Sequence, residues 1–143
     1  MFKLIFKYKF FASIIIFSII VGASLAIFAL QAKRNLTEIK KKSDLELMEV
    51  IKSYINTGDS KNLEPLICYG PASATTPDNT SRDIINYGNK GKVKFKNSGD
   101  IHNPKTYYFY PENADPEEYL GIFRVSIARE EKTGEACIIV PYG

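Results

Sequence analysis

The sequence predicts an α+β fold, in which an N-terminal transmembrane helix precedes a small domain of one or two helices packed on an antiparallel sheet of about four strands. A run of 21 residues, 10–30, carries no charge and holds 17 apolar side chains. Apolar residues then recur at helical spacing, and alternation with period two dominates the last third of the chain. The chain therefore divides into a basic tip (1–9), a transmembrane helix (10–30), a basic juxtamembrane segment (31–42) and a small α+β domain (43–143).

The apolar run is long enough to cross a bilayer as one helix, because 21 helical residues extend about 30 Å. A cleaved signal peptide is the alternative, since lysines precede the run and Ser-Leu-Ala at 24–26 is an acceptable cleavage site. The run, however, continues past Ala26 to Leu30 and exceeds the usual signal-peptide core of about 7 to 15 residues. We therefore expect an uncleaved signal-anchor in a single-pass membrane protein that contacts membrane lipid.

Basic residues flank the span on both sides, so the positive-inside rule is nearly balanced. N-terminal spans of this signal-like type usually deliver a long C-terminal domain across the membrane. We therefore expect residues 43–143 on the periplasmic or extracellular side. This domain carries 11 Lys and Arg against 15 Asp and Glu, a net charge of −4. That balance argues against general nucleic-acid binding, which depends on basic residues that neutralise phosphates.

Cys68 and Cys137 are the only cysteines of the chain. In an exported domain we expect them to form a disulfide, which closes a loop of about 70 residues and stabilises the domain by about 3 to 4 kcal/mol. The alternative is two buried thiols in a reducing compartment.

The first helix of the domain is predicted to start at Ser43, because Ser43 and Glu46 have the spacing of a capping box and Gly58 suits the helix end. A short helical turn is predicted next, with Asp59 or Ser60 as its N-cap. Pro65 limits the length of this turn. The apolar positions of the first helix recur every three or four residues and mark one buried face: Leu47, Val50, Ile51, Tyr54 and Ile55.

Residues 69–82 are rich in Gly, Pro, Ser and Thr and are predicted to form a loop. The strands expected after it lie at 92–96, 106–110, 119–129 and 135–142. Gly134 is expected to take a positive φ in a tight hairpin turn between the last two strands.

Three lysines, Lys92, Lys94 and Lys96, alternate with Val93 and Phe95 in the first expected strand. We interpret the lysines as protection of an edge strand, and contact with phosphate or lipid is the alternative.

No catalytic, cofactor-binding or metal-binding motif is recognised, so we expect no enzyme, no cofactor and no metal, and we identify no small-molecule ligand. The single histidine, His102, lies in an expected turn and is interpreted as a surface residue. An acidic connection is interpreted as a solvated loop, since its spacing fits no EF-hand. Its acidic residues are Glu112, Asp115, Glu117 and Glu118. A membrane-anchored enzyme or small-ligand protein is an alternative, and it predicts a pocket lined by aromatics such as Tyr107, Phe109 and Phe123.

The layout of a basic tip, a long hydrophobic helix, a polar helical extension, a variable loop, a four-stranded sheet and a late cysteine resembles type IV pilins and pseudopilins over nearly the whole chain. The family's Gly before the cleavage site and Glu five residues into the apolar segment are replaced by Lys9 and Ile14. The resemblance therefore concerns architecture and implies a filament or pseudopilus subunit as an alternative function.

A helix that ends in Gly58-Asp59, followed by Leu63 and Leu66, is similar to the opening of nuclear transport factor 2-like domains over about 25 residues. That fold also occurs in anchored secretion-system subunits. The expectation from the whole sequence is a single-pass membrane protein whose small exported domain makes protein-protein contacts with other membrane or envelope proteins, as a subunit of an envelope assembly or secretion apparatus.

Overall fold

A computed structural model describes residues 2–69, 75–88, 92–115 and 123–140, with only the backbone described for residues 2–14. The chain forms two compact units, residues 1–36 and 37–143, which are described separately. The elements in chain order are α1 (Phe2–Lys40), α2 (Asp44–Thr57), α3 (Ser60–Leu63), η1 (Glu64–Leu66), α4 (Pro77–Gly88), β1 (Val93–Asn97), β2 (Thr106–Pro111), β3 (Phe123–Arg129) and β4 (Ala136–Ile139).

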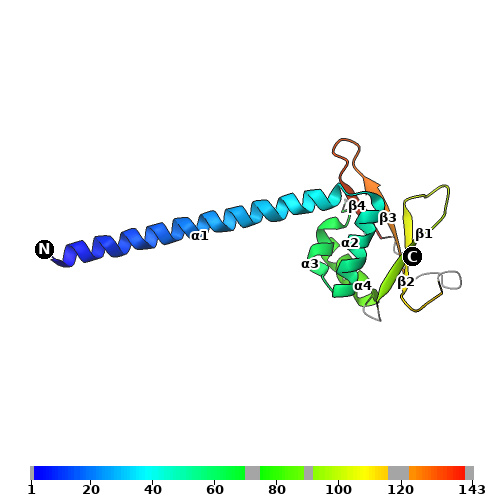
Figure 1. The fold of residues 1–143 in the computed structure, drawn as a ribbon, viewed down its shortest axis with the longest axis horizontal. Helices are drawn as coiled ribbons and strands as arrows, with labels where there is room; N and C mark the ends of the chain where they lie inside the picture. The colour runs from blue at the N-terminus through cyan, green and yellow to red at the C-terminus, as the bar shows by residue number, and fades with distance from the viewer. Residues whose placement is uncertain (1, 70–74, 89–91, 116–122, 141–143) are drawn as a thin grey trace. The chain divides into compact units, whose positions relative to one another are not determined.

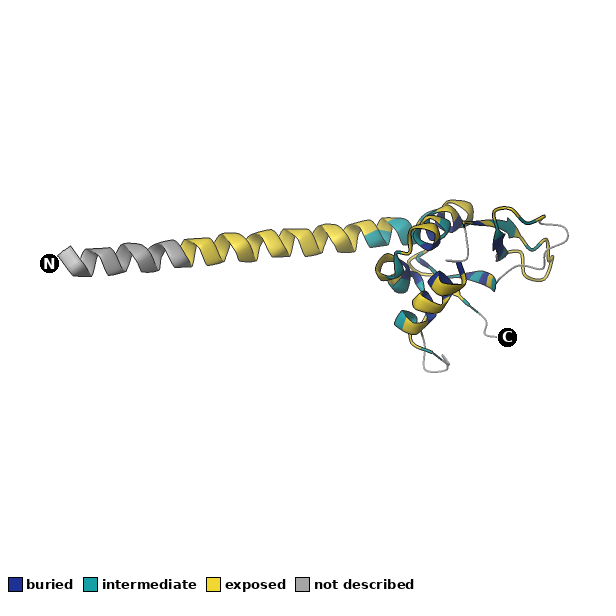
Figure 2. Ribbon diagram, turned by 90° about the horizontal axis from the view of Figure 1, so that it is seen from below, coloured by how far each residue is buried: buried dark blue, intermediate teal, exposed yellow. Residues whose placement is uncertain are grey.

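Helix α1 contains the apolar run and is long and apolar enough to cross a membrane. Its side chains from residue 15 to residue 35 are all exposed, as the yellow part of the helix in Figure 2 shows. Exposed apolar side chains on all sides of a helix are the pattern expected of a segment that lies in lipid. The helix also continues beyond Leu30 through most of the segment 31–42, which the sequence did not assign to an element.

Helix α2 begins and ends as predicted. Ser43 Oγ accepts a hydrogen bond from the Glu46 N–H, and the Glu46 carboxylate accepts one from the Ser43 N–H at 3.0 Å, so the capping box is present. Gly58 ends the helix with a φ of 71°, in the left-handed region that favours glycine. Its buried residues are Leu47, Met48, Ile51 and Ile55, so the predicted face is confirmed at three positions, Val50 and Tyr54 are half-buried, and Met48 joins them.

The short helical turn after Gly58 is confirmed, and Asp59 caps it by accepting a hydrogen bond from the Asn62 N–H at 3.2 Å. The prediction of a loop through residue 82 is wrong, because α4 starts at Pro77. Thr76 Oγ1 accepts a hydrogen bond from the Asn79 N–H at 3.3 Å and so satisfies a free donor of the first turn. Proline suits the first helical position, where its missing N–H has no partner to lose.

The four strands form one antiparallel sheet in the order β1-β2-β3-β4, which confirms the predicted α+β arrangement. Gly134 has a φ of 70° in the β3–β4 hairpin, as expected. The third strand fills the described part of its expected range, and the fourth is shorter than predicted because residues 135 and 140 are not in it. The remaining parts of these ranges, 119–122 and 141–142, lie outside the described residues.

In the unit 37–143, helices α2, α3 and α4 lie on one side of the sheet (Figure 1). The core between the two layers is apolar, and its largest fully buried side chains include Phe109, Leu47, Met48, Ile51 and Ile138. Helix α4 approaches α2 closely at Gly88, where an added Cβ would lie 2.3 Å from Ile55 Cγ2. A glycine at this position therefore permits the contact between the two helices.

Both outer strands of the sheet have partners from outside it. Ile67 forms a parallel bridge with Ile138 of β4, and the Cys68 N–H donates to the Ile138 carbonyl at 2.8 Å. At the opposite edge, the Val93 N–H donates to Asn56 Oδ1 at 2.8 Å, and Asn56 Nδ2 donates to the Val93 carbonyl at 3.3 Å. The side-chain amide of Asn56 thus satisfies the backbone N–H and carbonyl of Val93, as a neighbouring strand would.

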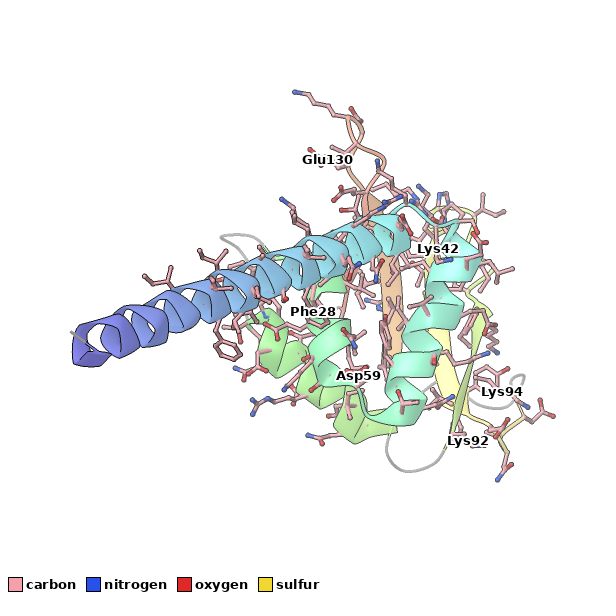
Figure 3. The ribbon with its side chains drawn as sticks, turned by 60° about the vertical axis from the view of Figure 1, so that its left-hand side comes forward. Phe28, Lys42, Asp59, Lys92, Lys94 and Glu130 are labelled. Carbon is pink, nitrogen blue, oxygen red and sulfur yellow. A yellow bond between two sulfur atoms is a disulfide. The ribbon has the colours of Figure 1, made fainter. Side chains whose placement is uncertain are left out.

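Strand β1 is at the edge of the sheet, as the lysine pattern predicts. Figure 3 shows Lys94 of this strand, and Lys92 just before it, at the margin of the domain. Charged side chains in this position discourage pairing with a strand from another molecule.

Candidate functional site

The face of the sheet that the helices do not cover, here called the outer face, carries the polar side chains of the strands. Side chains alternate between the two faces of a strand, and the register places residues of the outer face in straight rows across the sheet. One row joins Lys96, Tyr108 and Arg124, and the adjacent row joins Thr106, Ser126 and Ile139. The first row places an aromatic ring between two cations, and the second begins with two hydroxyls.

A hollow of about 270 Å³ lies over these rows, and every residue of the two rows except Lys96 lines it. Its floor is formed by strand residues, and one wall is formed by the loop between β1 and β2. It is lined by Ser98, Asp100, Asn103, Thr106, Tyr108, Arg124, Ser126 and Ile139. Small-molecule pockets typically hold roughly 300 to 1,000 Å³ and are mostly apolar, so this hollow is better matched to a single polar side chain than to an enclosed ligand.

The loop of residues 98–105 is held by its own hydrogen bonds and extends beyond the ends of β1 and β2 (Figure 1). Asn97 bonds both ends of the loop, since its Oδ1 accepts from the Gly99 N–H and its Nδ2 donates to the Pro104 carbonyl, both at 2.8 Å. The Ser98 N–H donates to the Thr106 carbonyl at 2.8 Å, and the Thr106 N–H donates to the Asn103 carbonyl at 3.1 Å. The wall of the hollow is therefore preorganised.

Asp100 organises the centre of this loop. Its carboxylate accepts hydrogen bonds from Asn103 Nδ2 and from the His102 N–H, both at 2.9 Å. The Asn103 amide first, and then the His102 N–H, hold the pKa of Asp100 below its ordinary value because they stabilise the charged form. The two oxygens of Asp100 are thus engaged inside the loop.

Ile101 stands on this same loop with 90% of its surface exposed. Single exposed apolar residues are common on protein surfaces, but this one is presented by a loop whose hydrogen bonds fix its backbone, beside a hollow whose rim includes the half-exposed Ile139. An apolar side chain displayed on a rigid support is typical of a binding surface.

The predicted disulfide is present, and it joins Cys68 to Cys137 with Cα atoms 5.0 Å apart. The bond ties the segment just after η1 to β4. His102 is exposed and takes part in the loop through its backbone, in keeping with the expected surface position.

The three aromatic residues of the enzyme alternative lie away from the hollow on the outer face, and none of them lines it. Tyr107 and Phe109 are buried in the core under the helices, and Phe123 stacks on Phe109 with ring centroids 4.8 Å apart. These rings fill the helix-covered face, whereas the hollow lies on the outer face. Among the described residues, no group of three or more His, Cys, Asp or Glu side chains gathers to hold a metal ion. Glu117 and Glu118 of the acidic connection lie outside the described residues.

The structure therefore defines a small, disulfide-bonded α+β domain in a chain with one candidate N-terminal membrane helix. No protein-family model, curated protein or solved structure matches the chain.

Sequence reasoning missed the hollow and its lining residues. One available signal was the composition of 97–103, Asn-Ser-Gly-Asp-Ile-His-Asn, where short side chains that bond neighbouring backbone groups surround an isolated isoleucine. A loop that can fix its own conformation and carries one apolar residue is a candidate for a contact surface.

Proposed function

We propose that this chain is a single-pass membrane protein, anchored by an uncleaved α1, whose domain lies in an oxidising compartment outside the cytoplasm and makes protein-protein contacts as a subunit of an envelope assembly or secretion apparatus. The observation that carries the contact function is Ile101, which the preorganised loop presents at 90% exposure. Burying this side chain against a partner contributes about 2 kcal/mol by area alone.

The disulfide supports the exported position of the domain. Disulfides persist in oxidising environments and are rare where thioredoxin and glutathione keep thiols reduced. An apolar N-terminal helix that acts as a signal also usually delivers the following domain across a membrane. The two features are independent, since one concerns helix α1 and the other is a bond between Cys68 and Cys137 within the domain.

A redox measurement tests the location. Cells are quenched in acid, and the thiols of the full chain are counted with a mass tag before and after reduction. Tagging of Cys68 and Cys137 only after reduction is the expected result. Two thiols that react without reduction overturn the exported position.

Site-specific photocrosslinking in intact cells tests the contact. A photoreactive residue replaces Ile101, and the matched control places it at Lys61, an exposed position on α3. We expect a discrete protein adduct at position 101 and none at position 61, and the partner's own reciprocal crosslink should return to the loop 98–105. Equal adducts at both positions, or none at position 101, contradict the contact function.

A further inference from the structure

The two rows of the outer face suggest what the hollow receives. Arg124 and Lys96 lie on strands either side of β2, roughly 10 Å apart at their Cα atoms, and Tyr108 lies between them. Neither cation forms an ion pair with another residue in the part of the chain that the structure describes. Their side chains are long enough to converge on one anionic group above the tyrosine.

The floor of the hollow offers further hydrogen-bond donors. Thr106 Oγ1 and Ser126 Oγ lie 2.8 Å apart, so one hydroxyl donates to the other and the second keeps its proton for another acceptor. Tyr108 adds a phenolic O–H. The acidic residue of the lining, Asp100, already accepts two hydrogen bonds from its own loop. Arg124, Tyr108 and one of the two floor hydroxyls can therefore donate to a single carboxylate.

Apolar groups border this polar centre. Ile101 is exposed on the loop whose residues Asp100 and Asn103 line the hollow, and Ile139, which ends the second row, lines the hollow itself and is also exposed. An extended segment that alternates acidic and apolar residues fits this surface. Its acidic side chains can reach the polar centre, and its apolar side chains can contact the exposed isoleucines.

We propose that the hollow on the outer face binds an extended acidic segment of a partner protein, with one carboxylate between Arg124 and Lys96 and an apolar neighbour against Ile101. The inference rests on the proposed function, because it assumes that the domain makes protein contacts and that the outer face is where it makes them. It adds the chemical class of the partner segment and the residues that select it.

The test uses the isotope-labelled full chain in zwitterionic detergent micelles and a blocked hexapeptide of alternating glutamate and valine. A peptide with glutamine in place of glutamate has the same shape without the charge. We expect the glutamate peptide to shift the backbone amide signals of the two rows and of the loop 98–105, and the glutamine peptide to bind about tenfold more weakly, as loss of a charge-assisted hydrogen bond implies.

Matched variants assign the effect to the hollow. Arg124→Gln and Lys96→Gln should each weaken binding of the glutamate peptide by about tenfold, and Lys61→Gln, the same change of charge on α3, should leave it unchanged. Equal weakening by Lys61→Gln, equal affinity of the two peptides, or amide shifts confined to the helices overturns the proposal.

Two further probes separate other anions from a protein carboxylate. If inorganic phosphate shifts the same amide signals and the glutamate peptide does not, the site is a free-anion site and the inference fails. If bicelles that contain phosphatidylserine do so without a peptide effect, the site takes a lipid headgroup and the inference also fails. A crosslink at position 101 together with a negative peptide result overturns only this inference and leaves the contact function standing.

Discussion

The guanidinium of Arg129 binds the carboxylate of Asp44 through two hydrogen bonds, from Nε at 2.9 Å and from Nη2 at 2.6 Å to Oδ1. The same guanidinium donates to the carbonyls of Lys42 and Gly134. Arg129 is the last residue of β3, and Asp44 is the first residue of α2. The Arg129 side chain therefore connects the segment between α1 and α2 to the β3–β4 hairpin by hydrogen bonds within the unit 37–143.

Loss of this arginine should lower the stability of the domain. Arg129→Ala leaves a half-buried carboxylate and two carbonyls without their donor, and we expect the free energy of unfolding to fall by about 2 kcal/mol. Arg129→Lys should restore only part of the loss, because an ammonium does not reproduce the planar fork. Urea denaturation of the full chain in mild detergent measures both.

Arg82→Ala is the control for that experiment. Arg82 also pairs with an aspartate, Asp78, but its side chain is 66% exposed, compared with 23% for Arg129. We expect a cost below about 0.5 kcal/mol for the exposed pair. Equal losses for Arg129→Ala and Arg82→Ala would show that the fastening of the α1–α2 segment adds no stability.

Asn56 should matter more than its exposed position on α2 suggests. Asn56→Ala removes both hydrogen bonds to Val93, whose surface is 2% exposed, and we expect a loss of about 1 to 2 kcal/mol and faster amide exchange at Val93. Asn56→Asp keeps the acceptor for the Val93 N–H, so its stability should lie between that of the unchanged protein and that of Asn56→Ala. Ser53→Ala, on an exposed turn of the same helix, should be nearly neutral. Unchanged exchange at Val93 in Asn56→Ala would refute the role of the amide.

Gly88→Ala should destabilise the contact between α4 and α2 by about 1 to 3 kcal/mol, the usual cost of excess volume in a packed core. The added methyl would lie 2.3 Å from Ile55 Cγ2. Ile55→Ala removes that atom, so the cost of Gly88→Ala should shrink in the Ile55→Ala background, as thermal denaturation of the four variants of a double-mutant cycle can measure. If the two substitutions have additive effects on stability, the cost of Gly88→Ala does not come from its contact with Ile55.

Acid should loosen the loop 98–105. The folded pKa of Asp100 is lowered, so the stability that its ionised form contributes is present above the ordinary aspartate pKa of about 3.9 and is lost as the pH falls through the lower folded value. Amide exchange at His102 should therefore increase, relative to the rate expected from pH alone, only below about pH 4. Asp100→Asn should abolish the dependence, and a midpoint at or above the ordinary value contradicts it.

Local chemistry made much of the fold predictable. The capping box at Ser43, the glycine at position 58 and the alternation around Val93 each determine structure within a few residues, and each is confirmed. Helix α4 was missed because its first turn, from Pro77 to Ser81, consists of residues that are equally typical of turns. The signal that distinguishes the two is Thr76 before Pro77, an N-cap followed by the preferred first residue of a helix.

The hollow could not be predicted from the sequence of any single strand, because residues of several strands form it. Strand β2 has aromatic rings on both faces, Tyr107 and Phe109 on one and Tyr108 and Tyr110 on the other, so its sequence does not show which face the helices cover. The position of Arg124 beside Tyr108 follows only from the register of β2 with β3. The disulfide was predictable because the chain has only two cysteines, but the closure of the β4 edge next to it was not.

Membrane anchoring, as proposed, would confine copies of this protein to a plane and raise their concentration near one another. Sheets with unoccupied outer strands would tend to add strand to strand under such crowding. Here the residues Ile67 and Cys68 cover one outer strand, and Asn56 with the neighbouring lysines protects the other. These contacts discourage backbone pairing between neighbouring copies at either edge of the sheet.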